Sequence, residues 1–531
     1  AIPGSLVLLF LLCPCIIYAH KILVYNPKFA YSHSHTMGSI ADLLVDGGHN
    51  VTSLIPEIDP QWKDGTEKSR IIRVSSAPEL VKLFEENKGN YTGLFEANAL
   101  SPINAAMMGL GMYAMFVPQC PHILDQPGLL ERLAEEKYDV YIVENVDMCG
   151  TALGHLIKAK ATITVSTTFL VAQQYEENGV PISTSLNPSA LVTVFNPHSL
   201  VDRLLNVYAH ALERLAFGVH RFFIERMFRQ RFGDDFPSLA AITANVSFVF
   251  TNTEPLIGIP TPTYARVVEI GGLGVKTPRE LDKKWKAILE ERPQTAIISF
   301  GSVARSVELP LEAKRAILKA ASRFPHTTFI WKYEGLQGED EFASREAVNV
   351  TNVHLVPWMP QNDLLHDLRT VLFVTHGGMG STQEAARHGV PLLVVPIFGD
   401  QPRNAASTAH NGNGKYFNKH HLSNEEKLTE ALRDVLENPS YRENAKRIAQ
   451  MIAAKPYSAK DLILKHVDFA GKFGPSKALR PVSVDMSFVA YHNIDLIILL
   501  SLVSVVVVYI YFKLSRYLIF LILRRIKVKR E

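Results

Sequence analysis

A histidine, two glycines and a serine stand together in the stretch FVTHGGMGSTQEA, which covers Phe373–Ala385. The stretch begins as an apolar strand, and the polar residues after Gly378 are typical of the start of a helix. Free N–H groups and the positive end of the helix dipole would then face an anion, and glycines let the backbone approach a phosphate. His376 and Ser381 can donate to phosphate oxygens. A plain turn is the alternative, because Gly377-Gly378 alone is a common pair.

Side chains suited to the rest of a nucleotide sugar stand on both sides of this turn. Trp358 follows an expected strand and offers a flat face to a base, while Gln361 can read a base edge. Stacking of a base on an aromatic ring is worth about 1–3 kcal/mol. Glu384 comes one to two helical turns after the glycines, where a carboxylate can accept from both ribose hydroxyls. Asp400 and Gln401 follow the next strand and suit the hydroxyls of a sugar.

Two histidines early in the chain are candidates for a general base. Transfer of a group to an alcohol needs a base, since a hydroxyl is a poor nucleophile at neutral pH, and histidine titrates in the right range. His33 and His35 lie in a loop expected between the first strand and the first helix, at the carboxyl edge of the sheet. A solvated loop histidine is the ordinary alternative for each of them.

The spacing of apolar residues predicts two α/β halves, each built on a parallel sheet. The first half opens as a βαβ unit. Its strands are expected over 21–26, from 51, over 138–143 and over 161–166. The second half has strands over 295–300, 327–333, 353–356, 370–375 and 391–398, separated by helices over 311–323, 363–368, 381–388 and 425–437. The stretch 271–280, which contains Gly and Pro, is the expected hinge.

The composition is globular, since 47% of the 531 residues are hydrophobic and 20% are charged. The net charge of +3 argues against a nucleic-acid-binding surface. An apolar run in residues 1–19 predicts a secretory signal peptide cleaved after Ala19, and a buried first strand is the alternative.

An uncharged apolar run near the other end predicts a transmembrane helix over 494–512. Residues 513–531 are rich in Lys and Arg, which places this tail in the cytoplasm and the body of a single-pass type I protein in a lumen. Lys527 and Lys529 resemble the dilysine signal of proteins retrieved to the endoplasmic reticulum membrane, while a basic tail at the membrane surface is the alternative.

An oxidising lumen permits a disulfide between Cys120 and Cys149, because the other two cysteines, Cys13 and Cys15, fall in the signal peptide. The same compartment allows N-glycosylation. Sequons begin at Asn90, Asn245 and Asn349, with a weaker candidate at Asn50, where a strand is expected.

The segments WMPQNDLL and FVTHGGMGSTQEAARHGVPLLVVPIFGDQPRNA closely resemble the signature of the UDP-glycosyltransferases, in particular the membrane-bound UDP-glucuronosyltransferase type. The resemblance extends over nearly the whole chain. It implies a GT-B fold, an α/β architecture in which two Rossmann-like, doubly wound domains face a cleft. It also implies an acceptor-binding domain over 20–273, a UDP-sugar-binding domain over 274–470 and a juxtamembrane segment over 471–493.

The same resemblance implies roles for the residues of the second half. Uracil would be held by Trp358 and Gln361, the ribose by Glu384, the diphosphate by His376, Gly377 and Gly378, and the sugar by Asp400 and Gln401. Ser302, in the sequence FGS, matches another position on the phosphate side. Many relatives have Asn where Gly380 stands, so Ser381 is expected to take more of the phosphate contact.

In the first half, the resemblance selects His33 as the base. Glu144 stands where relatives have an Asp that orients this histidine, and it keeps the charge on a longer arm. Asp147 is the alternative partner. Cys120 and Cys149 match a cysteine pair of the family.

The implied reaction is a direct displacement with inversion, in which a small lipophilic acceptor attacks a UDP-sugar without a metal ion or a cofactor. The donor is UDP-glucuronic acid or UDP-glucose, and Arg403 or an arginine of the first domain would serve the carboxylate of the former. The alternatives are a glycosyltransferase for a dedicated lipid or endogenous acceptor and a non-catalytic UDP-sugar-binding protein. Self-association into a homo-oligomer stays open.

Overall fold

A computed structural model describes residues 19–87, 93–96, 101–192, 196–336 and 340–528. The chain divides into two compact units, Ala1–Leu479 and Arg480–Glu531. The predicted signal peptide up to residue 18, with Cys13 and Cys15, lies outside the described residues, and so does the sequon at Asn90.

A parallel seven-stranded sheet, in the order β3-β2-β1-β4-β5-β6-β7, forms the first half of the larger unit. Its strands are β1 (Lys21–Tyr25), β2 (Asn50–Pro56), β3 (Arg70–Val74), β4 (Val140–Glu144), β5 (Ala161–Ser166), β6 (Phe248–Thr251) and β7 (Val267–Glu269). In β1, Ile22 and Val24 enter one core cluster, whereas Leu23 and Tyr25 enter another. Both faces are therefore buried, which explains the continuous apolar runs in the sequence.

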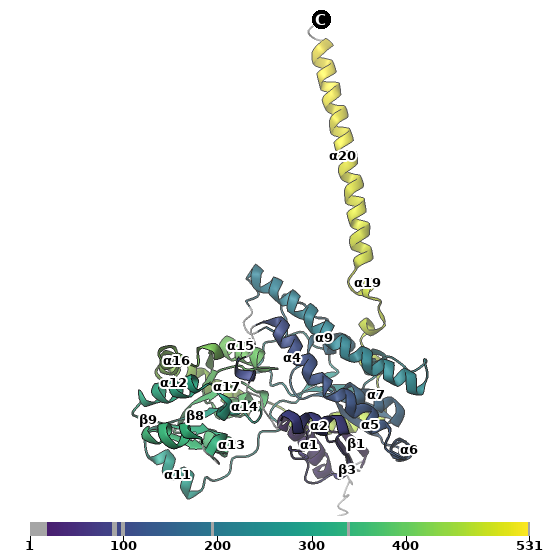
Figure 1. The fold of residues 1–531 in the computed structure, drawn as a ribbon. Coiled ribbons are helices and arrows are strands. Elements are labelled where there is room, and N and C mark those ends of the chain that lie inside the picture. The colour runs from purple at the N-terminus through teal and green to yellow at the C-terminus, as the bar shows by residue number, and fades with distance from the viewer. Residues whose placement is uncertain (1–18, 88–92, 97–100, 193–195, 337–339, 529–531) are drawn as a thin grey trace, which may run out of the picture. The chain divides into compact units, whose positions relative to one another are not determined.

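Helices pack around this sheet, and α4 lies beside the long helix α9 (Figure 1). The helices of the first half are α1 (Tyr31–Asp46), α2 (Pro78–Asn87), α3 (Gly93–Glu96), α4 (Pro102–Ala114), α5 (Phe116–Leu124), α6 (Leu129–Glu135), α7 (Met148–Ile157), α8 (Ala172–Glu177), α9 (Leu200–Phe232) and α10 (Leu239–Ala244). The ring centres of Tyr113 in α4 and Phe217 in α9 lie 4.7 Å apart. This contact joins the two helices through buried side chains.

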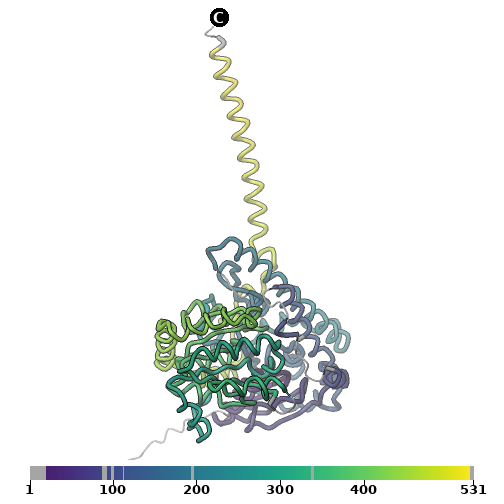
Figure 2. The backbone as a smooth tube through the Cα atoms, turned by 60° about the vertical axis from the view of Figure 1, so that its left-hand side comes forward, coloured from purple at the N-terminus to yellow at the C-terminus, as the bar shows by residue number. Residues whose placement is uncertain are grey.

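A parallel six-stranded sheet, in the order β10-β9-β8-β11-β12-β13, forms the second half (Figure 2, teal to green). Its strands are β8 (Gln294–Ser299), β9 (Thr327–Lys332), β10 (Val353–Val356), β11 (Thr370–Thr375), β12 (Leu392–Val394) and β13 (Gly414–Tyr416). Its helices are α11 (Lys283–Glu290), α12 (Leu311–Ser322), α13 (Gln361–His366), α14 (Met379–His388), α15 (Gln401–Asn411), α16 (Glu425–Glu437) and α17 (Pro439–Ala453). The strand predicted over 391–398 is paired only over Leu392–Val394.

Helix α18 (Ala459–Phe473) differs from the predicted domain boundary, which assigned 274–470 to the second half. Ile463, Val467 and Ala470 are buried in a core cluster of the first sheet. Their i, i+4, i+7 spacing gives α18 one apolar face, and the sequence does not specify which sheet will cover that face. The chain therefore crosses back to the first half after α17.

In the smaller unit, α20 (Ile494–Val528) is the one helix of the described residues that is long and apolar enough to cross a membrane. The apolar window extends over Ile494–Ile526. The helix continues beyond the span predicted over 494–512, and most of the predicted basic tail over 513–531 is therefore helical as well. The reason is that Tyr517–Leu523 are again predominantly apolar.

Two of the predicted glycosylation sites fall on exposed residues. Asn245 follows α10, and Asn349 precedes β10. Both side chains are solvent-exposed. Modification requires such exposure, so both sites stay predictions.

A disulfide between Cys120 and Cys149 joins α5 to α7, and both residues are buried. The Cα atoms lie 5.7 Å apart, and the residues are separated by 29 positions. The bond closes a loop that contains α6 and β4, so it ties α5 to the helix that follows the strand carrying Glu144.

Removal of this bond by combining Cys120→Ala with Cys149→Ala should lower the free energy of unfolding by about 3–4 kcal/mol, because the unfolded chain regains the freedom of a loop of roughly 30 residues. Thermal unfolding of the full chain in detergent, with and without reductant, measures this. Reductant should lower the midpoint of the parent protein only. Equal midpoints for parent and variant would contradict the expectation.

Candidate active site

The residues HGGMGS form the turn from β11 into α14. Gly377 has a φ of +84°, a conformation that favours glycine, and an added Cβ would lie 2.5 Å from Val394 Cγ1. Gly378 is the N-cap of α14 and has no side chain to cap this end. The N–H groups of the first helical turn lie at the positive end of the dipole, which favours an anion, and that of Met379 faces the carboxylate of Asp400.

The imidazole of His376 is clamped between two turns. An added Cβ on Gly301, in the turn after β8, would lie 2.7 Å from His376 Nε2, and one on Gly378 would lie 2.6 Å from the same atom. Ser302 continues the first of these turns. Burial, followed by the charge of Lys332, lowers the pKa of His376 to about 4. The ring is therefore neutral near pH 7 and can donate to a phosphate without carrying a charge itself.

Lys332, at the end of β9, is a cation of this site that sequence reasoning missed. Its Nζ donates to Gly301 O at 2.6 Å and pairs with Glu334 at 3.0 Å. The same atom lies 5.1 Å from the centre of the Trp358 ring. Lys332 thereby connects the turn at Gly301 to the ring of Trp358. No motif marks it, because only the sheet order places the end of β9 beside the end of β8.

The residues predicted for the base and the ribose are in contact with one another. Trp358 is 62% exposed, which leaves its ring open for stacking. Gln361 Nε2 donates to Glu384 Oε2 at 2.6 Å and to Ser381 Oγ at 3.2 Å. Burial raises the pKa of Glu384, and the hydrogen bond from Gln361 acts in the opposite direction. Further donors, such as ribose hydroxyls, would stabilise this carboxylate.

Gln401, predicted to contact the sugar, is buried and helps to shape its own loop. Its Oε1 accepts from the N–H groups of Ile397 at 2.8 Å and Phe398 at 3.0 Å. Only its Nε2 is left to donate to a ligand. The amide side chain was predicted from its type, and its engagement with the backbone could not be read from the sequence.

Asp400 lies at the start of α15. It is linked to the turn from β11 into α14 by Asn404, a residue that the sequence did not predict. Asn404 Nδ2 donates to Asp400 Oδ2 at 2.8 Å and to Gly377 O at 2.9 Å. Burial raises the pKa of Asp400, while the bond from Asn404 and the charge of His33 act in the opposite direction. A positive charge on His33, in the other half, would therefore favour the ionised form of Asp400. The i, i+4 spacing of Asp400 and Asn404 was the available signal.

His33 and Glu144 are in direct contact. His33 Nδ1 lies 2.7 Å from Glu144 Oε1, and Thr167 Oγ1 lies 2.6 Å from that oxygen and 2.7 Å from Nδ1. Glu144 is 1% exposed, and a buried carboxylate needs a donor. The imidazole supplies one through Nδ1–H, so Nε2 remains to accept a proton.

Both early histidines lie in a helix and not in the predicted loop. Helix α1 begins at Tyr31, so His33 and His35 occupy its first two turns. The residues YSHSHT are weak helix formers, which favoured the loop prediction. In the structure, Thr36 Oγ1 donates to Ser32 O at 2.9 Å, and the face that continues from Thr36 is buried. His33 lies against Glu144, while the ring of His35 stacks on Tyr31 at 5.5 Å.

Asp147 has a different role from Glu144. As the N-cap of α7 it accepts from Cys149 N at 2.9 Å, and it accepts from Tyr25 Oη at 2.6 Å. Burial raises its pKa from 3.8 to about 6, although these hydrogen bonds act in the opposite direction. Of the two carboxylates considered as partners for His33, Glu144 is the one that contacts it.

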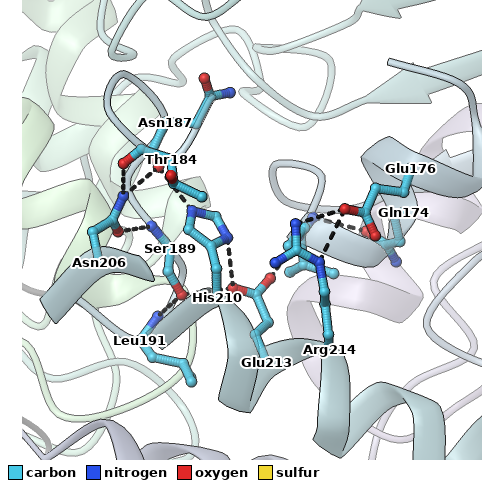
Figure 3. A network of polar contacts seen from close by, with 12 residues as sticks. Gln174, Glu176, Thr184, Asn187, Ser189, Leu191, Asn206, His210, Glu213 and Arg214 are labelled. Atoms are coloured by element: carbon cyan, nitrogen blue, oxygen red, sulfur yellow. Dashed lines mark hydrogen bonds and ion pairs between the residues drawn. The ribbon is translucent and has the colours of Figure 1, made fainter. Parts of the chain in front are cut away.

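A buried polar network anchors the segment after Thr167 to α9 (Figure 3). Glu213 of α9 is 3% exposed and accepts from Ala172 N and from Ser189 Oγ, both at 2.6 Å. Asn206 Oδ1 accepts from Ser189 N at 2.8 Å. The network holds α8 and the loop after it, and thereby fixes the chain that leaves Thr167.

Contacts between the halves surround this site. Gln383 of α14 donates to Asn252 O at 2.7 Å and accepts from Gly272 N, in the predicted hinge, at 3.0 Å. The guanidinium of Arg403 lies 4.1 Å from the centre of the Phe169 ring. These contacts join the carboxyl edges of the two sheets.

A family model described as UDP-glucoronosyl and UDP-glucosyl transferase matches residues 20–529. The chain belongs to this family. The UDP-glucuronosyltransferase 1A9 of Homo sapiens is 28% identical to this UDP-glycosyltransferase over 494 residues, which cover 92% of this chain and 89% of that relative. The family supports an enzyme that transfers glycosyl groups and binds a UDP-sugar donor.

Solved structures identify the fold as GT-B. The glycotransferase of kitacinnamycin has a TM-score of 0.57 at 17% identity and covers 85% of this chain and 99% of its own. The glycosyltransferase VinC in complex with DTDP has a TM-score of 0.56 at 16% identity and covers 85% of this chain and 100% of its own. Within the described residues, no group of three or more His, Cys, Asp or Glu could hold a metal ion. The metal-independent reaction stays a prediction.

Gly378→Ala should weaken UDP binding by about 10- to 100-fold, the loss expected for one hydrogen bond to a charged group, because the new Cβ would displace His376. Gly380→Ala is the matched control, since nothing lies within 4 Å of a Cβ there. Titration calorimetry with UDP measures both. Equal affinities for the two variants would show that the clamp on His376 does not matter for UDP.

Asp147→Asn tests the second carboxylate. Because folding raises its pKa, Asp147 contributes stability below about pH 4 that is lost as the pH rises through about 6. The unfolding free energy of the variant minus that of the parent should therefore increase by up to about 3 kcal/mol between pH 4 and 7. Denaturant unfolding at a series of pH values measures the difference, and parallel curves would contradict it.

Proposed function

We propose that this UDP-glycosyltransferase transfers glucuronic acid or glucose from UDP to a hydroxyl of a small lipophilic acceptor, with inversion and with His33 as the base. The observation that carries the proposal is the buried contact between His33 Nδ1 and Glu144 Oε1 at 2.7 Å. Among the described residues, His33 Nε2 has no hydrogen-bond partner. The pair supports catalysis over a function limited to binding UDP-sugar.

In the proposed step, His33 Nε2 takes the hydroxyl proton while the acceptor oxygen forms a bond to the anomeric carbon. The bond from that carbon to the diphosphate oxygen breaks, and its electron pair leaves with UDP. Attack on the face opposite to UDP inverts the anomeric centre. The imidazolium that forms lies against Glu144, which stabilises its charge.

Charge that develops on the leaving diphosphate would meet fixed donors of the second half. These are N–H groups at the start of α14, the ring of His376 between its two turns, and the ammonium of Lys332, which contacts Gly301 O. Donors that are already oriented stabilise a leaving anion without reorganisation. This arrangement supports a reaction without metal ion or cofactor.

We further propose that α20 anchors the enzyme in the endoplasmic reticulum membrane as a single-pass type I protein with luminal catalytic domains. The length and composition of α20 support an anchor, and the buried disulfide between Cys120 and Cys149 is compatible with an oxidising lumen.

His33→Ala should reduce turnover by about 10²–10⁴-fold while sparing UDP affinity, because the base acts only on the acceptor. Glu144→Gln should reduce turnover, and Asp147→Asn should not, because only Glu144 contacts the imidazole. UDP release by membranes carrying each variant, with UDP-glucose or UDP-glucuronic acid and a panel of phenols, measures this. Turnover that survives in His33→Ala, or that is lost only in Asp147→Asn, would remove the proposed pair from the mechanism.

A further inference from the structure

A cavity of about 290 Å³ lies between the two halves, beside the candidate active site. It is lined in the first half by the segment after β5, the loop after β6 and residues of β7, and in the second half mainly by residues of α14 and α15. Met379, in the first turn of α14, and Asn404, which binds Asp400, both line it. A group attached to a diphosphate at α14 is therefore close to this cavity.

Arg403 is the unusual side chain of this cavity. It is 7% exposed, and its guanidinium lies 4.1 Å from the centre of the Phe169 ring. Among the described residues, Arg403 makes no ion pair and no hydrogen bond. A buried charge is costly unless it is paired and hydrogen-bonded, and an aromatic face satisfies none of the guanidinium N–H donors. Arg403 is thus a cation in the cavity wall that has no anionic partner among the described residues.

The acidic side chains of the cavity have partners of their own. Glu254 pairs with Lys455 at 2.9 Å, and Glu269 accepts from Thr253 Oγ1 at 3.1 Å. Burial also raises the pKa of Glu269. Among the charged lining residues that the structure describes, Arg403 is therefore the one with neither a hydrogen bond nor an ion pair.

Polar groups around Arg403 suit a hydroxylated ligand. Ser407 and Thr408 line the cavity from the next turn of α15, and Thr382 lines it from α14. Asn413 is 2% exposed and lines the cavity as well, and its Oδ1 has no partner among the described residues. Hydroxyls and amides of this kind bind sugar or phenol hydroxyls, while a guanidinium binds a carboxylate in a bidentate manner.

We propose that Arg403 binds a carboxylate in this cavity and thereby selects acidic substrates, an inference that rests on the proposed function. The carboxylate belongs either to the uronic acid of the donor or to an acidic acceptor. Both sources share the chemistry that Arg403 recognises, and they are distinguished by which ligand loses affinity.

The test compares the affinities of the full-length protein and of Arg403→Gln for UDP, UDP-glucose and UDP-glucuronic acid. The variant should bind UDP-glucuronic acid about 10- to 100-fold more weakly and the other two unchanged, since only the charged hydrogen bonds are lost. Arg403→Lys should retain part of the preference. Arg433→Gln, at an exposed arginine of α16, is the matched control and should change none of the three.

A second arm compares 4-hydroxybenzoate with its neutral amide, 4-hydroxybenzamide, by binding in the presence of UDP. Weaker binding of the acid alone in Arg403→Gln, with donor affinities unchanged, would assign the carboxylate to the acceptor. Unchanged affinities for every ligand would overturn the proposal. Because both arms measure binding, they remain decisive if the protein consumes no donor, a result that would contradict only the proposed function.

Ser407→Glu provides a variant that keeps the arginine. The new carboxylate would lie one helical turn from Arg403 and supply an internal partner. It should weaken binding of the acidic ligand as Arg403→Gln does, and it should leave UDP affinity unchanged. If Arg403→Gln lost UDP binding through misfolding, this variant would decide the question, and full affinity for both acids would overturn the proposal.

Discussion

The carboxylate of Glu144 is held out of water at the end of β4, and the geometry of the candidate site in the first half depends on the partners that it has there. The sheet order places β4 between β1 and β5. Residues that follow β1 and β5 therefore flank the carboxylate, and they supply His33 and Thr167. Because an unpaired buried carboxylate would be costly, the contact also fixes the orientation of the imidazole. The same contact thus stabilises the buried carboxylate of Glu144 and leaves Nε2 of His33 free to accept a proton.

The second half would stabilise an anion mainly with groups that carry no charge. At the N-terminus of α14 the helix presents a dipole and no formal charge, and burial keeps His376 neutral. Lys332 adds one cation whose position is set by Gly301 O and the Trp358 ring. An anion that arrives or develops here is stabilised by donors that are already in place, so little rearrangement is needed during the reaction.

The two halves are linked by the chain twice, through the hinge that includes Gly272 and again where the chain enters α18. Helix α18 buries its apolar face against the first sheet, although the segment before it belongs to the second half. Side-chain contacts at Gln383 and Arg403 add to these links. The carboxyl edges of the two sheets meet through these contacts.

The two α/β halves and the turn at His376 are predicted from the sequence, since apolar runs, glycines and helix starts are signals that depend only on neighbouring residues. The same signals did not predict the short strands β3, β6, β7 and β13, whose pairing depends on distant neighbours. Tertiary structure alone decided that Glu144 and not Asp147 contacts His33, that Lys332 and Asn404 join the site, and that α18 belongs to the first core. It also decided that Gln401 Oε1 is used by its own loop. Each of these outcomes depends on which strands are neighbours and which helical faces are buried, and long-range packing sets both.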